Sequence, residues 1–250
     1  MRSGLNERQN QIMDRVLLEG EVKVGDLKDF FQVTEMTIRR DLEKLEQLGL
    51  MRRTFGGAIP VTFDLSLKER NSFRIEEKIK IGRVAAELVL PGQAIFIDGG
   101  TTTFQIARHL KPHSSITVVT NALNVAAELL EKQIHTIVIG GMVMEKTMSL
   151  VGPIAIETLQ KMAFDQVFLG TTGITIAHGF SNSNVFEAEL KKKAIAQATK
   201  VTIVVDHSKF GEKQLISFAQ MTDVHCIVTD QAPPETFREE ATQRGIEMIF

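Results

Sequence analysis

Residues 34 to 49 read TEMTIRRDLEKLEQLG, and this stretch decides how the first part of the chain folds. Apolar residues recur in it at helical spacing and define one buried face: Ile38, Leu42, Leu45 and Leu48. Thr34 is a favourable N-cap residue for this helix. Thr37, Arg40 and Asp41 fall off the apolar face, and Arg39 lies at its edge. Two adjacent arginines here either form a solvated surface or contact a partner.

Two further helices and a hairpin are expected around this helix. The first helix begins near Asn6, an N-cap candidate, and ends at Gly20. After a short extended piece, Asp26 caps a second helix that carries three apolar residues, Leu27, Phe30 and Phe31. LMRRTFGGA, residues 50 to 58, alternates and ends in a glycine pair, which is typical of a hairpin. Together these elements predict a winged helix-turn-helix.

This arrangement predicts double-stranded DNA as a partner. A recognition helix presents its N-terminal half to base edges in the major groove. An arginine there can bind guanine with two hydrogen bonds, or it can clamp a phosphate. The residues expected to contact DNA are Thr34, Thr37, Arg39, Arg40, Lys44, Arg52 and Arg53. For TIRRDL alone a solvated face stays open, with Arg40 paired to Glu43 or Lys44 to Asp41.

Composition limits the other possibilities. The 250 residues are 43% hydrophobic and 24% charged, which suits one large domain with a small companion. The net charge is −2, so a nucleic-acid partner has to be met by a local basic patch. Cys226 is the single cysteine, which excludes an internal disulfide. The sequence has neither a signal peptide nor an apolar run of roughly 18 residues, so we expect a cytoplasmic protein without a membrane partner.

The chain changes character near residue 60. We expect a winged helix-turn-helix domain over residues 1–60, a linker over 61–74 and an α/β domain over 75–250. Six apolar runs in the last part are typical of buried parallel strands: residues 94–98, 116–120, 136–140, 166–170, 202–206 and 226–230. Amphipathic helices separate most of them. The second domain is therefore predicted to be a mostly parallel sheet covered on both faces.

Polar residues follow several of these strands, at the edge where such sheets bind ligands. The first strand runs into DGGTTT, residues 98 to 103, where glycines, hydroxyls and a helix N-terminus can hold a phosphate. The residues expected to bind an effector are Asp98, Gly100, Thr101, Thr102, Thr103, Asn121, Gly141, Glu187, Lys191 and Lys209. Two alternatives stay open: a glycine turn with a threonine N-cap, and a surface ion pair between Glu187 and Lys191.

The sequence resembles the DeoR family of bacterial transcription regulators over nearly its whole length. The first part matches at Arg8, Ile12 and Val16, and through TEMTIRRDLEKLEQLG and RRTFGGA. The second matches at DGGTT, VVTN, IGG, SLVGP, FLGTTGI, the E-x-x-x-K of Glu187 to Lys191, and DHSKFG. Three positions differ from the family pattern. Phe55 stands where histidine is common, Gly99 replaces a serine, and GTTG at 170–173 replaces G-A-D/N-G.

The resemblance implies a second domain related in fold to sugar-phosphate isomerases, which senses phosphorylated sugars with the phosphate on Thr101 to Thr103. We therefore expect a repressor of sugar uptake or catabolism genes, assembled as a homo-oligomer through the effector domain. No catalytic residue, metal ligand or cofactor is expected. One alternative is a sugar-phosphate isomerase-like enzyme, with Glu187 or Asp98 as base and Lys209 as electrostatic partner. Another is a constitutive DNA-binding protein with a vestigial pocket.

Overall fold

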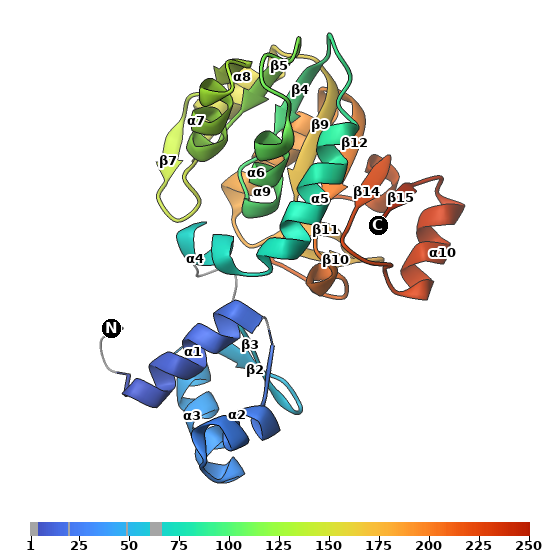
Figure 1. The fold of residues 1–250 in the computed structure, drawn as a ribbon. Coiled ribbons are helices and arrows are strands. Elements are labelled where there is room, and N and C mark those ends of the chain that lie inside the picture. Colours follow the sequence, from blue (N-terminus) through green and yellow to red (C-terminus); the bar gives the residue numbers. More distant parts are fainter. Residues whose placement is uncertain (1–4, 20, 49, 61–66) are drawn as a thin grey trace. The chain divides into compact units, whose positions relative to one another are not determined.

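A computed structural model describes residues 5–19, 21–48, 50–60 and 67–250 of the chain. It divides into two compact units, Met1–Ile75 and Glu76–Phe250 (Figure 1). Each unit has its own hydrophobic core. The predicted linker falls partly on residues 61–66, which lie outside the described residues.

The first unit is the predicted winged helix-turn-helix. Its elements are α1 (Glu7–Glu19), β1 (Val22–Lys23), α2 (Val24–Phe31), α3 (Glu35–Gln47), β2 (Met51–Arg53), β3 (Gly57–Pro60) and α4 (Leu67–Ser72). The strands form an antiparallel sheet in the order β1-β3-β2. Ile38, Leu42 and Leu45 of α3 are fully buried against Ile12 and Val16 of α1, as their helical spacing predicts.

Three details of this unit differ from the sequence prediction. The second helix begins at Val24 rather than after Asp26, because β1 leads directly into it. The side chain of Phe30 is 58% exposed, since Val24 and Leu27 occupy the buried face of this short helix. Leu48 is 54% exposed because the helix ends at Gln47 and the chain leaves its register there. Gly20, the predicted end of the first helix, and Gly49, the last residue of the quoted stretch, lie outside the described residues.

The second unit is built around a seven-stranded sheet. Its helices are α5 (Ile75–Glu87), α6 (Thr101–His109), α7 (Leu123–Glu131), α8 (Pro153–Gln160), α9 (Val185–Ala196) and α10 (Glu235–Gln243), with short 3-10 helices η1 (His207–Lys209) and η2 (Met221–Asp223). Its strands are β4 (Ala94–Ile97), β5 (Thr117–Thr120), β6 (His135–Val138), β7 (Met142–Met144), β8 (Ser149–Val151), β9 (Phe164–Gly170), β10 (Gly173–Thr175), β11 (Gly179–Asn182), β12 (Ala198–Val204), β13 (Ile216–Ala219), β14 (Cys226–Val228) and β15 (Glu247–Ile249).

The order of the main sheet is β15-β14-β12-β9-β4-β5-β6, and each neighbouring pair is parallel. From β4 the chain moves outward through β5 to β6, and it then returns to the other side of β4 as β9. The strand order therefore reverses between β4 and β9. In open α/β sheets, ligands bind at such a reversal, beyond the carboxyl ends of the strands.

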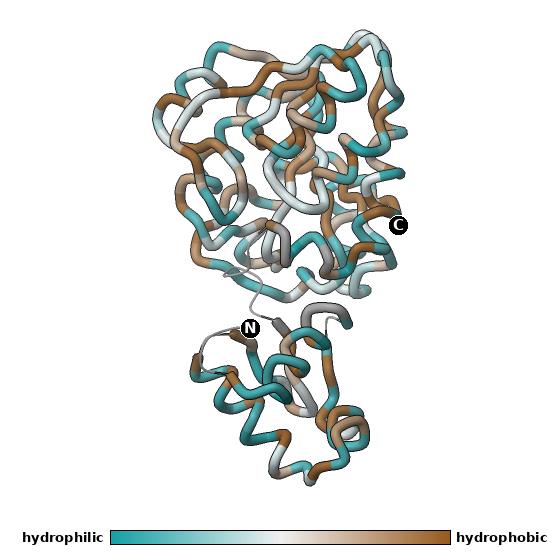
Figure 2. The backbone as a smooth tube through the Cα atoms, turned by 60° about the vertical axis from the view of Figure 1, so that its left-hand side comes forward, coloured by the Kyte–Doolittle hydropathy of each residue, from teal (hydrophilic) through white to brown (hydrophobic). Residues whose placement is uncertain are grey.

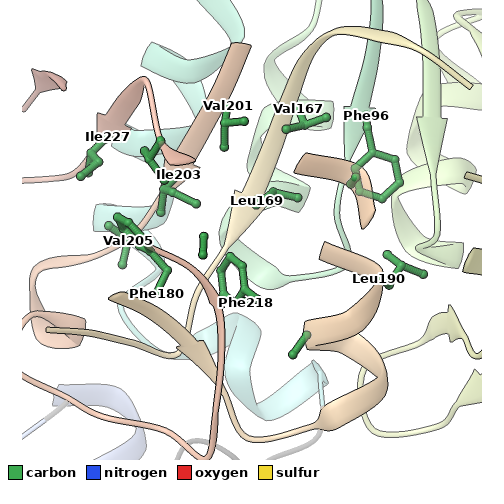
Figure 3. Packing of buried hydrophobic residues seen from close by; sticks show 14 of the residues in the cluster. Phe96, Val167, Leu169, Phe180, Leu190, Val201, Ile203, Val205, Phe218 and Ile227 are labelled. Atoms are coloured by element: carbon green, nitrogen blue, oxygen red, sulfur yellow. The ribbon is translucent and has the colours of Figure 1, made fainter. Parts of the chain in front are cut away.

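Alternate residues of the central strands enter two different cores, which confirms a sheet covered on both faces. Phe96, Val167 and Leu169 pack in one cluster, which Figure 3 shows from close by. Ile97 and Phe168 pack in the other. In Figure 2, brown hydrophobic stretches run through the middle of this unit. All six predicted strands are present.

The sequence prediction missed several strands and overstated one. β15 was not predicted, and neither were the antiparallel sheets β7-β8 and β10-β11-β13. The prediction that every parallel strand is buried is wrong for β6, where Ile137 is 37% and Val138 is 42% exposed. Among the residues that the structure describes, β6 is the last strand of the sheet, so no neighbouring strand covers its outer side.

Candidate DNA-contacting surface and effector site

The start of α3 is fixed by two of the predicted DNA-contacting threonines. The Thr34 hydroxyl caps the helix by accepting a hydrogen bond from the Thr37 amide at 3.3 Å. The two hydroxyl oxygens lie 3.0 Å apart, and this pair is exposed. The cap explains why the helix begins at Glu35. It also leaves both hydroxyls at the exposed helix N-terminus.

The basic residues of α3 lie on its exposed side. A guanidinium nitrogen of Arg39 is 3.7 Å from a Glu35 carboxylate oxygen, and both side chains are more than half exposed. Such a pair contributes little to stability. Arg40 and Lys44 are also exposed, and neither has a carboxylate partner among the residues that the structure describes. The alternative pairings with Glu43 and Asp41 are therefore not formed.

Asp41 is buried, which corrects its predicted place off the apolar face. One carboxylate oxygen accepts from Arg8 Nε at 2.6 Å, and the other accepts from the Gln9 side-chain amide at 2.9 Å. Both partners lie on α1, so Asp41 fixes the recognition helix to the first helix. Its acidic charge is neutralised by Arg8 and does not oppose a DNA phosphate.

The hairpin is fastened to the recognition helix through Glu46. Its carboxylate accepts from the Arg53 amide at 2.8 Å and lies 3.5 Å from Arg53 Nε. A Cβ at Gly57 would lie 1.7 Å from the Val22 carbonyl oxygen, so only glycine allows β1 to pair with β3. Arg52 and Arg53 are exposed, and Phe55 at the hairpin tip is fully exposed.

At the strand reversal of the second unit, Asp98 and Lys191 form a buried ion pair. Lys191 Nζ lies 3.0 Å from Asp98 Oδ2, and both side chains are at most 4% exposed. The ammonium also donates to the Gly170 carbonyl at 2.6 Å and to Asn182 Oδ1 at 3.3 Å. Its three donors thus meet three oxygens, which is the condition for keeping a lysine charged inside a protein.

Burial raises the pKa of Asp98 above its usual value of 3.8. The Lys191 ammonium acts in the opposite direction, and the nearby Glu187 carboxylate raises the pKa further. The Gly170 amide also donates to Asp98 Oδ2, at 3.3 Å. Asp98 therefore links the ends of β4 and β9 to helix α9.

Glu187 does not pair with Lys191, so the alternative of a surface i,i+4 pair is wrong. Its Oε2 accepts from the Asn182 side-chain amide at 3.1 Å. Its Oε1 is buried and has no hydrogen-bond partner among the described residues. Asn184 caps α9 by accepting from the Glu187 amide at 3.1 Å, which fixes the first turn of the helix. One buried acceptor is therefore available to a ligand that donates hydrogen bonds.

The threonine loop begins directly after β4. Thr101 and Thr103 are buried, whereas Thr102 is partly exposed. The Thr103 hydroxyl donates to the Gly100 carbonyl at 3.1 Å, so it closes the first turn of α6. The first amides of α6, like those of any helix, have no carbonyl partner within the helix, and a helix N-terminus favours an anion.

Asn121 holds this loop in place. Its Oδ1 accepts from the Gly99 amide at 3.0 Å, and its Nδ2 donates to the Leu150 carbonyl at 3.2 Å. A Cβ at Gly99 would lie 2.9 Å from Ser149 Cβ, so the approach of β8 explains a glycine at this position. Both ends of the Asn121 side chain are thus used by the protein itself.

The remaining predicted residues lie on the loops around this site. Gly141 has φ +146°, and a Cβ there would lie 2.6 Å from the Val151 carbonyl oxygen of β8. Lys209 is a partly exposed residue of η1, which follows β12. The structure brings Asp98, Glu187 and Lys191 together. Asn121 is connected to them through its hydrogen bond with Gly99, the residue after Asp98. Gly141 instead supports the packing of β8.

Sequence reasoning missed Asn182 and Ser149. Both lie on antiparallel strands, β11 and β8, and not at the ends of the predicted parallel strands. The rule that ligands bind at the carboxyl ends of parallel strands does not identify residues on antiparallel strands. The run FSNSN, residues 180 to 184, was the available signal, because a polar run beside a buried phenylalanine is unusual in a strand.

Two negative findings complete the description. Within the described residues, no group of three or more histidine, cysteine, aspartate or glutamate side chains is arranged to hold a metal ion. In the same part of the chain, no helix combines the length and apolar character required to cross a membrane.

A winged helix-turn-helix followed by an α/β unit with a polar site at its strand reversal defines a two-domain transcription regulator. Comparison with family models agrees. The model described as a DeoR-like helix-turn-helix domain matches residues 8–62. The model described as a DeoR C terminal sensor domain matches residues 74–231. The chain belongs to the DeoR family, as its sequence motifs predict.

Curated relatives match over almost the full length. A putative aga operon transcriptional repressor of Escherichia coli O157:H7 is 32% identical, over 99% of this chain and 94% of that protein. The glycerol-3-phosphate regulon repressor of Escherichia coli K12 is 31% identical, over 97% of each chain. Both relatives are named as regulators of transcription and not as enzymes, which agrees with the expectation that this chain is a regulator.

Solved structures support the fold alone. The translation initiation factor eIF-2B of Pyrococcus horikoshii OT3 matches with a TM-score of 0.52 at 13% identity, over 90% of this chain and 96% of that chain. Ribose 5-phosphate isomerase A of Methanocaldococcus jannaschii matches with a TM-score of 0.41 at 16% identity, over 54% of each chain. Similarity this low carries no inference about activity.

Proposed function

We propose that this regulator represses genes for sugar uptake or catabolism, and that a phosphorylated sugar bound in the second unit controls its affinity for operator DNA. The observation that carries the proposal is the buried Asp98–Lys191 pair at the strand reversal, beside the N-terminus of α6. A buried charge pair is costly to keep, which favours a functional role for it.

In the DNA-binding unit, Arg39 and Arg40 would read base edges from the N-terminal half of α3. Thr34, Thr37 and Lys44 would add contacts to phosphates or bases. Arg52 and Arg53 of the hairpin would hold the backbone. The exposure of these side chains on one unit supports this assignment.

In the effector unit, the phosphate would lie at the start of α6, against Gly100, Thr101 and Thr102, with Thr103 and Asn121 shaping the loop. Lys191 would supply positive charge near it, and Lys209 would add charge from η1. The buried acceptor Glu187 Oε1 suits a sugar hydroxyl, and Asp98 offers a second carboxylate.

The proposal extends to the whole protein. Residues 1–60 would act as the DNA-binding domain, 61–74 as the linker and 75–250 as the sensor. The protein would work in the cytoplasm as a homo-oligomer, because helix-turn-helix proteins bind paired half-sites as symmetric dimers. A tenfold change in DNA affinity on effector binding corresponds to about 1.4 kcal/mol of coupling.

Differential scanning calorimetry with phosphorylated sugars and their unphosphorylated parents tests the sensor part. Calorimetry suits this chain because it has no tryptophan or tyrosine for fluorescence. A ligand at 100 times its Kd stabilises the folded state by about 2.7 kcal/mol, so one phosphosugar should raise the melting temperature of the second unit. An unphosphorylated parent should not. If no phosphosugar in the panel changes the melting curve, the sugar-phosphate assignment is wrong.

A further inference from the structure

Phe55 lies at the tip of the β2–β3 hairpin, and neither the DNA contacts nor the effector site proposed above uses it. Its side chain is 105% exposed, whereas Leu130, the next most exposed large apolar side chain among the described residues, is 75% exposed. Single exposed apolar side chains are common on protein surfaces. Phe55 differs from them in the fixed turn that presents it and in the charge that surrounds it.

A well-held turn presents the ring to solvent. The Thr54 amide donates to the Gly57 carbonyl at 3.0 Å, which closes the turn around Phe55. The Gly56 carbonyl accepts from the Val24 amide at 2.8 Å, so the start of α2 holds the other side of the turn. Figure 1 shows the turn between β2 and β3 projecting from the first unit. The backbone that carries Phe55 is therefore fixed, while the ring lies outside the core cluster of this unit.

The surroundings of the ring are basic. Residues 50–60 contain two exposed arginines, Arg52 and Arg53, and no carboxylate. The Arg53 guanidinium lies 3.5 Å from Glu46 of α3, but the two side chains are 42% and 40% exposed, and an exposed pair of this kind is weak. A polyanion with flat apolar rings therefore suits this hairpin, and DNA combines both properties.

The hairpin can reach the groove beside the one that α3 would enter. Glu46, in the last turn of α3, accepts from the Arg53 amide at 2.8 Å, so β2 lies next to the recognition helix. Phe55 follows two residues later, about 7 Å further along an extended chain. A helix in the major groove is bordered by the phosphate backbone, and the minor groove lies beyond that backbone. With the arginines on the phosphates, the hairpin tip would lie at the minor groove.

We propose that Phe55 enters the minor groove of the operator and inserts part of its ring between two base pairs. Apolar wedges of this kind partly unstack one base step and bend the duplex by about 20–90°. A phenylalanine ring cannot read bases through hydrogen bonds, so it favours a step that opens easily, TA or CA/TG. Phe55 is then a specificity-determining residue that acts through the deformability of DNA. This inference rests on the proposed function, because it requires that the first unit binds DNA.

A fluorescent adenine analogue, whose emission is quenched by stacking, tests the inference. The chain has no tryptophan or tyrosine to interfere with this emission. The probe is the duplex from upstream of the protein's own gene cluster that the full chain protects from nuclease, with the analogue replacing one adenine at a time. Every TA or CA/TG step contains an adenine, so the scan covers all of them. Each protein is added until anisotropy shows that the duplex is saturated.

Phe55→Ala is the main variant, and Phe55→Leu is the conservative one, since leucine also acts as a wedge in the minor groove. Thr54→Ala is the matched control, because Thr54 is an exposed neighbour in the same turn. Circular dichroism melts check that the three variants are folded. Neither change at Phe55 removes a core contact, because the side chain is fully exposed.

We expect the wild type and Thr54→Ala to raise the emission several-fold at one pyrimidine–purine step, and Phe55→Leu to keep part of this rise. Phe55→Ala should leave the emission of that step as in free DNA and should lose about tenfold in affinity, as loss of a stacking ring does. If the wild type binds but no position brightens, or if Phe55→Ala brightens the same step as strongly, the inference is overturned and the regulator proposal stands. A wild type that binds no upstream DNA would instead overturn the DNA-binding part of the proposed function.

Discussion

Individual residues of TIRRDL have different functions although they are neighbours in the sequence. Ile38 and Leu42 build the core, and Asp41 ties α3 to α1 through Arg8 and Gln9. Arg40 is exposed and has no carboxylate partner among the described residues. Arg40 is thus exposed for a contact with DNA, whereas Arg39 makes a weak, exposed ion pair with Glu35.

Arg40→Ala should weaken operator binding by about 1–3 kcal/mol without changing the unfolding curve. The reason is that Arg40 makes no ion pair among the described residues, whereas on DNA the bidentate base contact that we propose would be lost. Fluorescence anisotropy and urea unfolding measure the two quantities. Arg53→Ala is a useful comparison, because loss of a phosphate contact should weaken all sequences alike and lower the salt slope by about 1. Unchanged operator affinity in Arg40→Ala would mean that Arg40 belongs to a solvated face and does not contact DNA.

Asp41→Ala, unlike Arg40→Ala, should lower the stability of the first unit. It leaves Arg8 and the buried Gln9 amide without their acceptor, which costs about 1–3 kcal/mol for the first unit. Urea unfolding followed by circular dichroism measures the loss. Glu43→Ala, an exposed neighbour on the same helix, is the control and should change stability little. Equal stability of both variants would contradict the role assigned to Asp41.

Lys191→Met should destabilise the second unit by about 3–5 kcal/mol at pH 7, because it leaves the Asp98 carboxylate buried without its cation. The loss should shrink as the pH falls. The pKa of Asp98 is already raised by burial and rises further without Lys191. In Lys191→Met, Asp98 therefore binds its proton more tightly in the folded state than in the unfolded state. Protonation of Asp98 thus stabilises the folded variant at low pH, and this stabilisation is lost as the pH rises through the folded pKa.

Calorimetric melts between pH 5 and 7 test this pH dependence, with the exposed Lys192→Met as control. The melting temperature of Lys191→Met, relative to wild type, should recover toward pH 5. A constant difference across this range would mean that the carboxylate is not the source of the instability.

At the scale of elements, the sequence predicts what depends on local pattern. The helical period of Ile38, Leu42 and Leu45 and the apolar runs of the six parallel strands suffice for the fold class. The run of residues 136–140 carries no information about its place at the sheet edge, so the exposure of β6 was missed. β15 has three residues and Glu247 at its start, which hides it from a hydrophobicity pattern.

The candidate effector site could be predicted only in part, because some of its residues are positioned by contacts that no local sequence pattern indicates. Asp98 and the threonines follow a predicted strand, so the rule for strand ends finds them. Lys191 lies on a helix four residues after Glu187, and this spacing favours a surface ion pair. Its burial depends on packing against Phe218 of β13, whose strand was not predicted. Tertiary contacts therefore decide whether Lys191 is a surface residue or a buried one.

The threonine loop gives a prediction at this scale. Thr102→Ala should weaken binding of a phosphorylated effector about tenfold, because one partly exposed hydroxyl at the α6 N-terminus is lost. The stability of the unit should change little. Thr103→Ala should instead reduce stability, because its buried hydroxyl closes the first turn of α6. Isothermal calorimetry and thermal melts separate the two effects. An effector response that survives both changes would mean that the phosphate lies elsewhere.

At the scale of the whole molecule, the proposed function requires coupling between two units that have separate cores. Effector binding and DNA binding must change each other's affinity by the same factor, since linkage is reciprocal. A phosphosugar that weakens operator binding tenfold must itself bind tenfold more weakly to the DNA complex. Titrating the effector into free protein and into the DNA complex would reveal both factors.

The central claim is tested most directly by fluorescence anisotropy of labelled DNA from upstream of the protein's own gene cluster. Protein is titrated at fixed salt, alone and with each phosphosugar or its unphosphorylated parent. We predict that the DNA binds, that one phosphosugar shifts the midpoint at least tenfold, and that its parent sugar leaves the midpoint unchanged. A midpoint that no sugar phosphate moves would contradict the sensor role. DNA that fails to bind under all of these conditions would contradict the regulator account as a whole.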